Sequence, residues 1–94
     1  MLQIDQSEPG VIRLAGRFDA SQEQKARQVF TRIHTSCVIS FEQLEYISSA
    51  GLSVLLETQR RLDRDGHTLR LVAMRPPIRN VFMIAGFDAV FEIG

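Results

Sequence analysis

Apolar and polar residues divide the chain into short blocks with two different periods. Four blocks show the alternation or the short apolar run that is typical of a β-strand: "VIRLA" (11–15), "CVISF" (37–41), "LRLVAM" (69–74) and "AVFEI" (89–93). "CVISF" is apolar on both faces except at Ser40, which predicts a central strand covered on at least one side. The sheet has four strands, or five if "LQID" (2–5) pairs as well.

The blocks between these strands repeat their apolar residues with the period of a helix. Three helices are predicted: one that starts at Asp19, one from Ala50 to Asp65, and one that Pro76 and Pro77 open and Gly86 ends. Their inner faces are Ala26, Val29, Phe30 and Ile33; Leu52, Leu55, Leu56 and Leu62; and Ile78, Val81, Phe82 and Ala85. Gln22 lies in capping-box spacing from Asp19, and Gln59 interrupts the leucine stripe.

Strands and helices alternate from one end of the chain to the other, which predicts an α/β fold. We expect a mixed four- to five-stranded sheet packed with α-helices, in one domain that spans residues 1–94. The chain is 45% hydrophobic and 23% charged, as expected for a folded globular domain.

Composition narrows the classes of function. Eleven Lys plus Arg balance eleven Asp plus Glu, so the overall charge gives no reason to expect a nucleic-acid partner. The start "MLQIDQSEPG" lacks the features of an export signal and no long apolar stretch follows, so we expect no membrane insertion and a cytoplasmic protein. The one cysteine, Cys37, lies in an apolar run, where a small buried side chain is its commoner role.

The stretch "EYISSAGLSVLLETQ" (45–59) joins a strand to a helix through small residues. Serine is favoured where a helix begins, because its hydroxyl accepts a hydrogen bond from a backbone N–H, and this explains Ser48 or Ser49 as a cap. The helical period also places Ser49 roughly 110° from the leucine stripe, beside Ser53 and Arg60. A phosphate there suits the helix N-terminus but repels a docked partner, so placement alone leaves both roles open.

An enzyme is not indicated by these residues. Only His34 and His67 could act as histidine bases for Ser49, and no Gly-x-Ser-x-Gly motif surrounds that serine. The histidines and Cys37 lack the short spacing of metal ligands, and no phosphate-binding loop is present. We therefore expect no catalytic residue, no metal and no cofactor.

Three stretches together carry a family resemblance: "LAGRFDA" (14–20), "CVISFEQLEYISSAGLSVLLETQRRL" (37–62) and "IRNVFMIAGFDAVFEI" (78–93). With them the whole chain resembles a STAS domain of the anti-sigma-factor antagonist family, with a SpoIIAA-like fold. In that family the serine two residues before the motif glycine is phosphorylated. The resemblance therefore implies that Ser49 is the phosphorylated residue, with Gly51 and Leu52 completing the motif.

The resemblance also implies a partner-switching cycle. The unphosphorylated domain binds an anti-sigma factor that is itself a serine kinase of the histidine-kinase-like ATPase type, and a sigma factor is released. Phosphorylation breaks the complex and a PP2C-type phosphatase restores it. Asp19 matches the acidic residue of the family's "GELD"-like turn. Ser48 and Ser40 stand where many members have Asp, which makes Ser48 an alternative acceptor.

We expect the partner to contact residues at and along the start of the second predicted helix: Asp19, Ser48, Ser49, Gly51, Ser53, Leu56 and Arg60. The sequence leaves one alternative open. The chain could instead be a constitutive STAS subunit of a lipid transporter, or of a stressosome or secretion-signalling scaffold, that is never phosphorylated.

Overall fold

A computed structural model describes all residues from Met1 to Gly94. Five strands form one sheet in chain order: β1 (Leu2–Asp5), β2 (Val11–Phe18), β3 (Cys37–Ile47), β4 (Leu69–Val72) and β5 (Glu92–Ile93). β1 pairs antiparallel with β2, and every other pairing is parallel. The mixed α/β fold predicted from the sequence is therefore confirmed, with "LQID" as the fifth strand.

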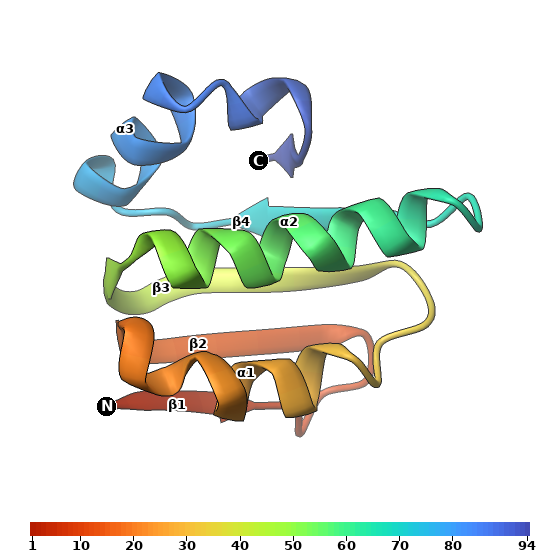
Figure 1. Cartoon of the computed structure of the whole chain (residues 1–94), viewed down its shortest axis with the longest axis horizontal. Coiled ribbons are helices and arrows are strands. Elements are labelled where there is room, and N and C mark those ends of the chain that lie inside the picture. The colour runs from red at the N-terminus through yellow and green to blue at the C-terminus, as the bar shows by residue number, and fades with distance from the viewer.

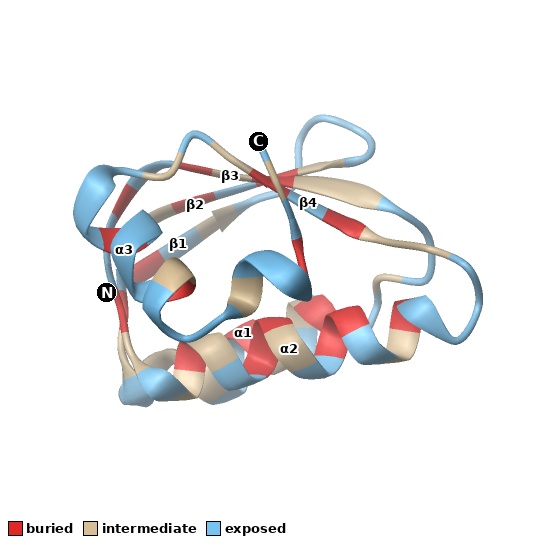
Figure 2. Cartoon of the chain, turned by 90° about the horizontal axis from the view of Figure 1, so that it is seen from above, coloured by how far each residue is buried: buried red, intermediate tan, exposed pale blue.

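The helices are α1 (Glu23–Phe30), α2 (Ser49–Asp63) and α3 (Pro76–Ile84), with short 3₁₀ turns η1 (Ala20–Gln22) and η2 (Phe87–Ala89). Figures 1 and 2 show α1 and α2 side by side on one face of the sheet, with α3 and η2 beside α2 at the β4 and β5 side. The opposite face of the sheet carries no helix (Figure 2).

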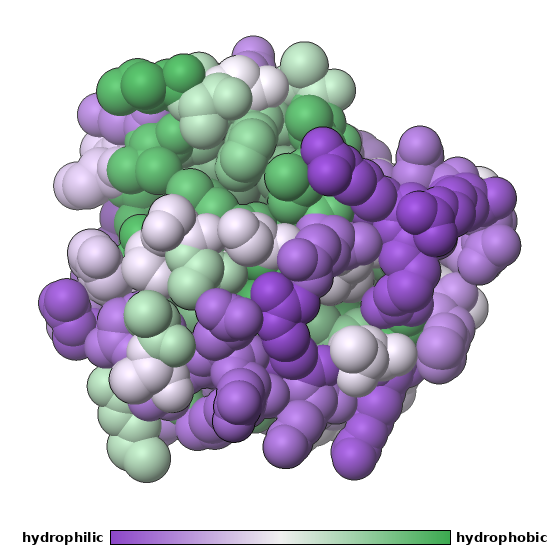
Figure 3. Space-filling view, viewed as in Figure 1, coloured by the Kyte–Doolittle hydropathy of each residue, from purple (hydrophilic) through white to green (hydrophobic).

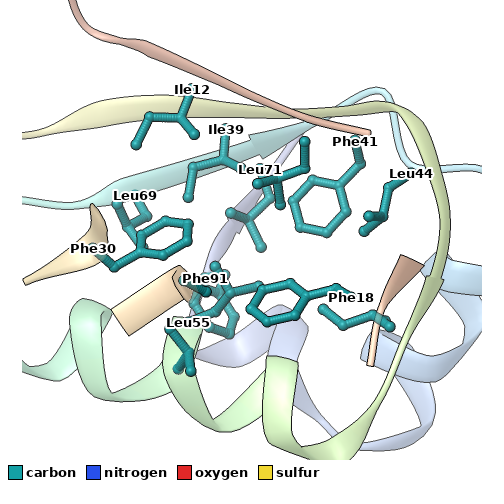
Figure 4. Close-up of a cluster of buried hydrophobic side chains, with 14 of the residues drawn as sticks. Ile12, Phe18, Phe30, Ile39, Phe41, Leu44, Leu55, Leu69, Leu71 and Phe91 are labelled. Atoms are coloured by element: carbon teal, nitrogen blue, oxygen red, sulfur yellow. The ribbon is translucent and has the colours of Figure 1, made fainter. Parts of the chain in front are cut away.

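The layer between sheet and helices is a continuous hydrophobic core of 18 buried residues. Figure 4 shows side chains of β2, β3 and β4 meeting those of α1 and α2. Phe82 of α3 makes edge-on contacts with Phe41, Phe87 and Phe91, at centroid separations of 5.7 to 6.0 Å. These aromatic contacts attach α3 and the C-terminal segment to the sheet, since edge-to-face pairs stabilise beyond the area that they bury.

Two predicted elements end earlier than their sequence pattern indicates, and a third begins later. α1 stops at Phe30, so Ile33 packs partly against the core from the following turn and not from the helix. The predicted strand 69–74 stops at Val72, because Ala73 has a left-handed backbone with φ of 59°. The predicted strand 89–93 was wrong for its first half: η2 includes Ala89, and only Glu92–Ile93 is a strand, because Phe91 turns inward to Phe82.

The inner face of α3 is narrower than predicted. Ile78 and Phe82 are buried, but Val81 is 40% exposed and Ala85 is exposed, so the prediction for these two residues was wrong. Pro76 and Pro77 open α3 as expected.

The capping box predicted for Asp19 and Gln22 does not form. Asp19 caps η1 by accepting from the Ser21 N–H, but the Gln22 amide oxygen accepts instead from the Leu2 N–H at 3.1 Å. The Lys25 ammonium donates to the Leu2 carbonyl. Both outward-facing backbone groups of Leu2, on the edge strand β1, are thus satisfied by side chains next to the sheet.

Candidate functional site

The β3–α2 junction begins with a change of backbone conformation at Ser48. This residue is extended, with φ of −89° and ψ of 172°, and α2 begins at Ser49. The Ser48 hydroxyl accepts from the Gly51 N–H at 3.3 Å, and the Ser48 N–H donates to the Phe18 carbonyl at 2.9 Å. Ser48 is therefore the N-cap of α2, and its backbone ties the helix start to the end of β2.

Gly51 is the residue that lets α2 approach the sheet. It is buried in the first turn, and a Cβ added there would lie 2.8 Å from Ile47 Cγ1 and 3.0 Å from Phe18 Cγ. Such distances leave no room for a side chain, because core atoms around it are closely packed. The glycine of the sequence motif therefore has a packing reason that is independent of any partner.

Ser49 differs from its neighbour in both exposure and bonding. It occupies the first position of α2, is exposed, and its hydroxyl makes no hydrogen bond in the structure. Backbone N–H groups of a helix's first turn point outward along the axis and give that end a partial positive charge. An added phosphate on Ser49 would meet favourable backbone dipoles and open solvent.

Asp19 lies beside this junction, because it directly follows Phe18, whose carbonyl accepts the Ser48 N–H. Its carboxylate accepts from the hydroxyl and the backbone N–H of Ser21. The hydroxyl hydrogen bond is the main cause of a lowered Asp19 pKa, so the carboxylate is charged at neutral pH. The structure thus brings Asp19, Ser48, Ser49 and Gly51 together at one end of the domain.

The remaining candidates extend along α2. Ser53 and Arg60 are exposed, as the helical period predicted, whereas Leu56, predicted for the inner face, is half-buried at its edge. Arg60 lies about 16 Å along the helix axis from Ser49, at 1.5 Å per residue. The predicted residues therefore form a cluster at the start of α2 and a stripe along its outer side, and not one compact pocket.

Arg17 and Tyr46 form a stacked pair at the same end of the sheet, which the sequence did not predict. The Arg17 guanidinium lies 4.3 Å from the centre of the Tyr46 ring. These residues face each other in the β2–β3 register, one position before Phe18 and Ile47. The pair places a positive charge close to Asp19, and only the strand register, which the sequence alone does not give, brings its members together.

The other groups considered from the sequence lie apart from this cluster. His34 is exposed after α1, and the His67 Nδ1 is 3.5 Å from the Ser36 hydroxyl. Burial raises the pKa of the Cys37 thiol. No group of three or more His, Cys, Asp or Glu side chains could hold a metal ion. None of the helices has both the length and the apolar composition needed to cross a membrane.

Comparison with known proteins identifies the fold and its family. A family model described as "Mlab, STAS domain" matches residues 2–92. The chain therefore belongs to the STAS domain family.

Two relatives add names to this assignment. BtrV of Bordetella bronchiseptica, whose name includes the words anti-sigma factor antagonist, is 39% identical over 56 residues, which are 60% of this chain and 48% of BtrV. The match thus spans about half the length of that relative. The STAS-domain containing protein PA14_20770 of Pseudomonas aeruginosa is 25% identical over 87% of this chain and 84% of its own length.

Solved structures share the fold. An anti-sigma factor antagonist from Mycobacterium paratuberculosis has a TM-score of 0.81 with 21% identity, over 99% of this chain and 83% of that chain. The Bacillus cell fate determinant SpoIIAA in its phosphorylated form has a TM-score of 0.73 with 19% identity, over 100% of this chain and 91% of that chain.

Proposed function

We propose that this STAS domain is an anti-sigma-factor antagonist whose binding to its partner is turned off by phosphorylation of Ser49. The observation that carries the proposal is the difference between two adjacent hydroxyls. Ser48 is occupied as the helix cap, whereas Ser49 is exposed and makes no hydrogen bond. A kinase that approaches this end of the domain finds one free acceptor, with Asp19 close by.

The mechanism follows from charge. Phosphorylation adds about 1.5 to 2 negative charges at neutral pH. The backbone dipoles of α2 tolerate this charge in the free domain, so the fold is kept. A partner docked over Asp19, Ser49 and Ser53 would have to desolvate or neutralise it, and unpaired charge at an interface costs several kcal/mol. One covalent change would thus release the complex without unfolding the domain.

The partners that fit this role are an anti-sigma factor of the histidine-kinase-like ATPase type, which supplies ATP and kinase activity, and a PP2C-type phosphatase that reverses the modification. The name of BtrV supports the antagonist role, whereas the kinase and the phosphatase are what the family resemblance implies. The alternative is a constitutive STAS subunit that is never phosphorylated, and the match to a family model described as "Mlab, STAS domain" is compatible with it. The presence of Ser48, where many antagonists have Asp, is compatible with either function.

The test is phosphorylation by the histidine-kinase-like ATPases of the source genome, followed by intact-mass measurement and peptide mapping. We expect one phosphate on Ser49 in the wild type, none in Ser49→Ala, and normal phosphorylation in Ser7→Ala. Ser7 is the control, because it is an exposed serine in the β1–β2 turn, outside the proposed docking surface. Phosphate on Ser48 would move the site by one residue.

Binding to the histidine-kinase-like ATPase that phosphorylates the domain is then measured by calorimetry. Ser49→Ala should bind like the wild type, and Ser49→Asp should raise Kd by about 100-fold, in line with the several kcal/mol of an unpaired interface charge. Two results together would refute the switch and favour the constitutive subunit. The kinases would be active on another substrate but leave this protein unphosphorylated, and the wild type, Ser49→Ala and Ser49→Asp would bind with equal affinity.

A further inference from the structure

α3 carries an apolar stripe that the core does not use. Pro77, Val81 and Ile84 follow the i, i+4, i+7 spacing of one helix side and are all exposed, with Ile84 at 88%. The buried side of the helix, Ile78 and Phe82, lies next to this stripe. An isoleucine left almost wholly in water at such a spacing is unusual, because a helix stripe of this kind normally packs against another surface.

The stripe belongs to a larger apolar surface that borders α2. Val90, after η2, is 40% exposed and lines a shallow hollow with Gln59 and Arg60 of α2. Figure 3 shows hydrophobic residues gathered over α3 and η2 on the face where the outer sides of α1 and α2 are also visible. Both ribbon views place α3 at the end of the domain where α2 begins. We call Pro77, Val81, Ile84 and Val90 the α3 patch.

Size argues against the α3 patch as a complete interface of its own. A stable complex buries roughly 800 Å² on each partner, from about 20 to 30 residues a side. Four side chains supply only a small part of this, so a dimer of two such patches falls short. The patch gains a sufficient area only together with the adjoining outer side of α2, which runs from Ser49 to Arg60.

Charge indicates what kind of surface covers the patch. Arg75 and Arg79 are the only charged residues between Ala73 and Phe87. Asp63 lines the hollow that Val90 shares, and the exposed Asp88 lies two residues before Val90. Asp63 and Asp88, the acidic residues near Val90, disfavour an anionic lipid surface, whereas a protein segment can place its own carboxylates opposite Arg75 and Arg79 and avoid these acids.

We propose that the α3 patch is the second half of the docking surface for the same partner that covers Ser49. It receives an apolar segment of that partner, with carboxylates that face Arg75 and Arg79. This inference rests on the proposed function. In it, contacts with α3 contribute most of the affinity for the partner, and phosphorylation of Ser49 turns binding off. An apolar anchor near the centre of an interface contributes more to affinity than charges at its rim.

The experiment compares Ile84→Asp with the wild type in two assays: binding to the histidine-kinase-like ATPase loaded with ADP, which cannot transfer a phosphate, and phosphorylation of Ser49 by the same ATPase supplied with ATP. We expect Kd to rise by at least about tenfold, mainly through faster dissociation, and phosphorylation of Ser49 to slow in parallel. Ile84→Val should retain wild-type affinity. Because Ile84 is 88% exposed, thermal unfolding of the aspartate variant should match that of the wild type.

The charge control is Gln6→Asp, an exposed position in the β1–β2 turn at the opposite end of the domain. It introduces the same charge and should leave Kd unchanged. Wild-type affinity of Ile84→Asp, with Ser49 still phosphorylated, would overturn the α3 patch and leave the proposed function intact. If the wild type neither binds nor is phosphorylated, the proposed function and this inference fail together.

Two further measurements distinguish other occupants. If the wild type sediments with phosphatidylglycerol vesicles and Ile84→Asp does not, the α3 patch binds a lipid surface and not a protein. If light scattering shows that the wild type is a dimer and Ile84→Asp a monomer, the α3 patch binds a second copy of this chain. Either result overturns the proposal, which expects a monomer that does not bind vesicles.

Discussion

Adjacent residues at the start of α2 have separate physical roles. Ser48 closes the helix, Ser49 faces solvent, and Gly51 provides the space that Ile47 and Phe18 need. These roles explain why small residues follow one another there. Under the proposed function they also separate stability from regulation, because the residue that caps the helix differs from the one that would be phosphorylated.

This separation predicts opposite outcomes for two alanine variants. Ser48→Ala removes the hydrogen bond to the Gly51 N–H and should lower stability by about 1 kcal/mol. For a domain of this size that corresponds to a decrease in Tm of about 4 to 8 °C. Ser49→Ala should leave Tm unchanged, as measured by circular dichroism. A larger loss for Ser49→Ala would show that its hydroxyl supports the fold after all.

At the scale of elements, α2 is joined to the sheet by a polar side chain within its buried face. Gln59 is 5% exposed, and its amide oxygen accepts from the Leu69 N–H at 2.8 Å, where β4 begins. The interruption of the leucine stripe is therefore a hydrogen bond between elements. Arg61 has a similar role, since its guanidinium donates to the carbonyls of Phe30 and Ile33 at the end of α1.

Completing the leucine stripe should therefore destabilise the protein. Gln59→Leu adds apolar surface but leaves the Leu69 N–H buried without an acceptor, which costs roughly 1–3 kcal/mol. Urea unfolding measures the loss. Gln28→Leu is the control, on an exposed position of α1 with no side-chain hydrogen bond, and should change stability by less than about 0.5 kcal/mol. A Gln59→Leu variant as stable as wild type would contradict this account.

Patterns of neighbouring residues predicted those features of the fold that depend on interactions within a few residues. Helix periodicity gave α2 within two residues, and the prolines marked the start of α3, because both signals act within a few residues. The partner of Gln22 and the inward turn of Phe91 depend on contacts between distant segments, and both were mispredicted. The exposure of Ser49 at the start of α2 was predictable from the helical period, whereas the exposure of Val81 was not, because Val81 has the spacing of an inner residue.

For the molecule as a whole, the ion pairs lie on the surface and the hydrophobic core carries most of the stability. Arg27 pairs with Glu23 in its own helix and with Glu57 across to α2. All three side chains are at least 36% exposed, so salt screens them and each pair contributes little. Their effect is therefore clearest in the dependence of stability on pH.

Acid should weaken the fold in a defined range. The pKa values of Asp5, Asp19 and Glu57 are lowered, chiefly by the Ser7 backbone N–H, the Ser21 hydroxyl and the Arg27 guanidinium respectively. A depressed pKa gives stability that is complete above the unfolded-state values of 3.8 for Asp and 4.5 for Glu, and that is lost as the pH falls through the lower folded-state pKa. Tm should therefore decrease as the pH is lowered below these values.

Thermal unfolding between about pH 7 and about pH 3 in low salt measures this effect. Glu57→Gln should reduce the acid sensitivity, because its side chain no longer titrates against Arg27. A Tm that stays constant over the whole range would show that these carboxylates bind protons equally in the folded and unfolded states.

The side-chain hydrogen bonds to Leu2 have a consequence for concentrated solutions. An open strand edge is a template on which other chains can add, and fibrils grow in this way. On β1, an incoming chain would have to displace Gln22 and Lys25 before it could form its first backbone bond to Leu2. At the other edge, β5 has only two residues, Glu92–Ile93. Addition of a strand at Leu2 therefore requires two side-chain hydrogen bonds to break first, and β5 offers only two residues as a template.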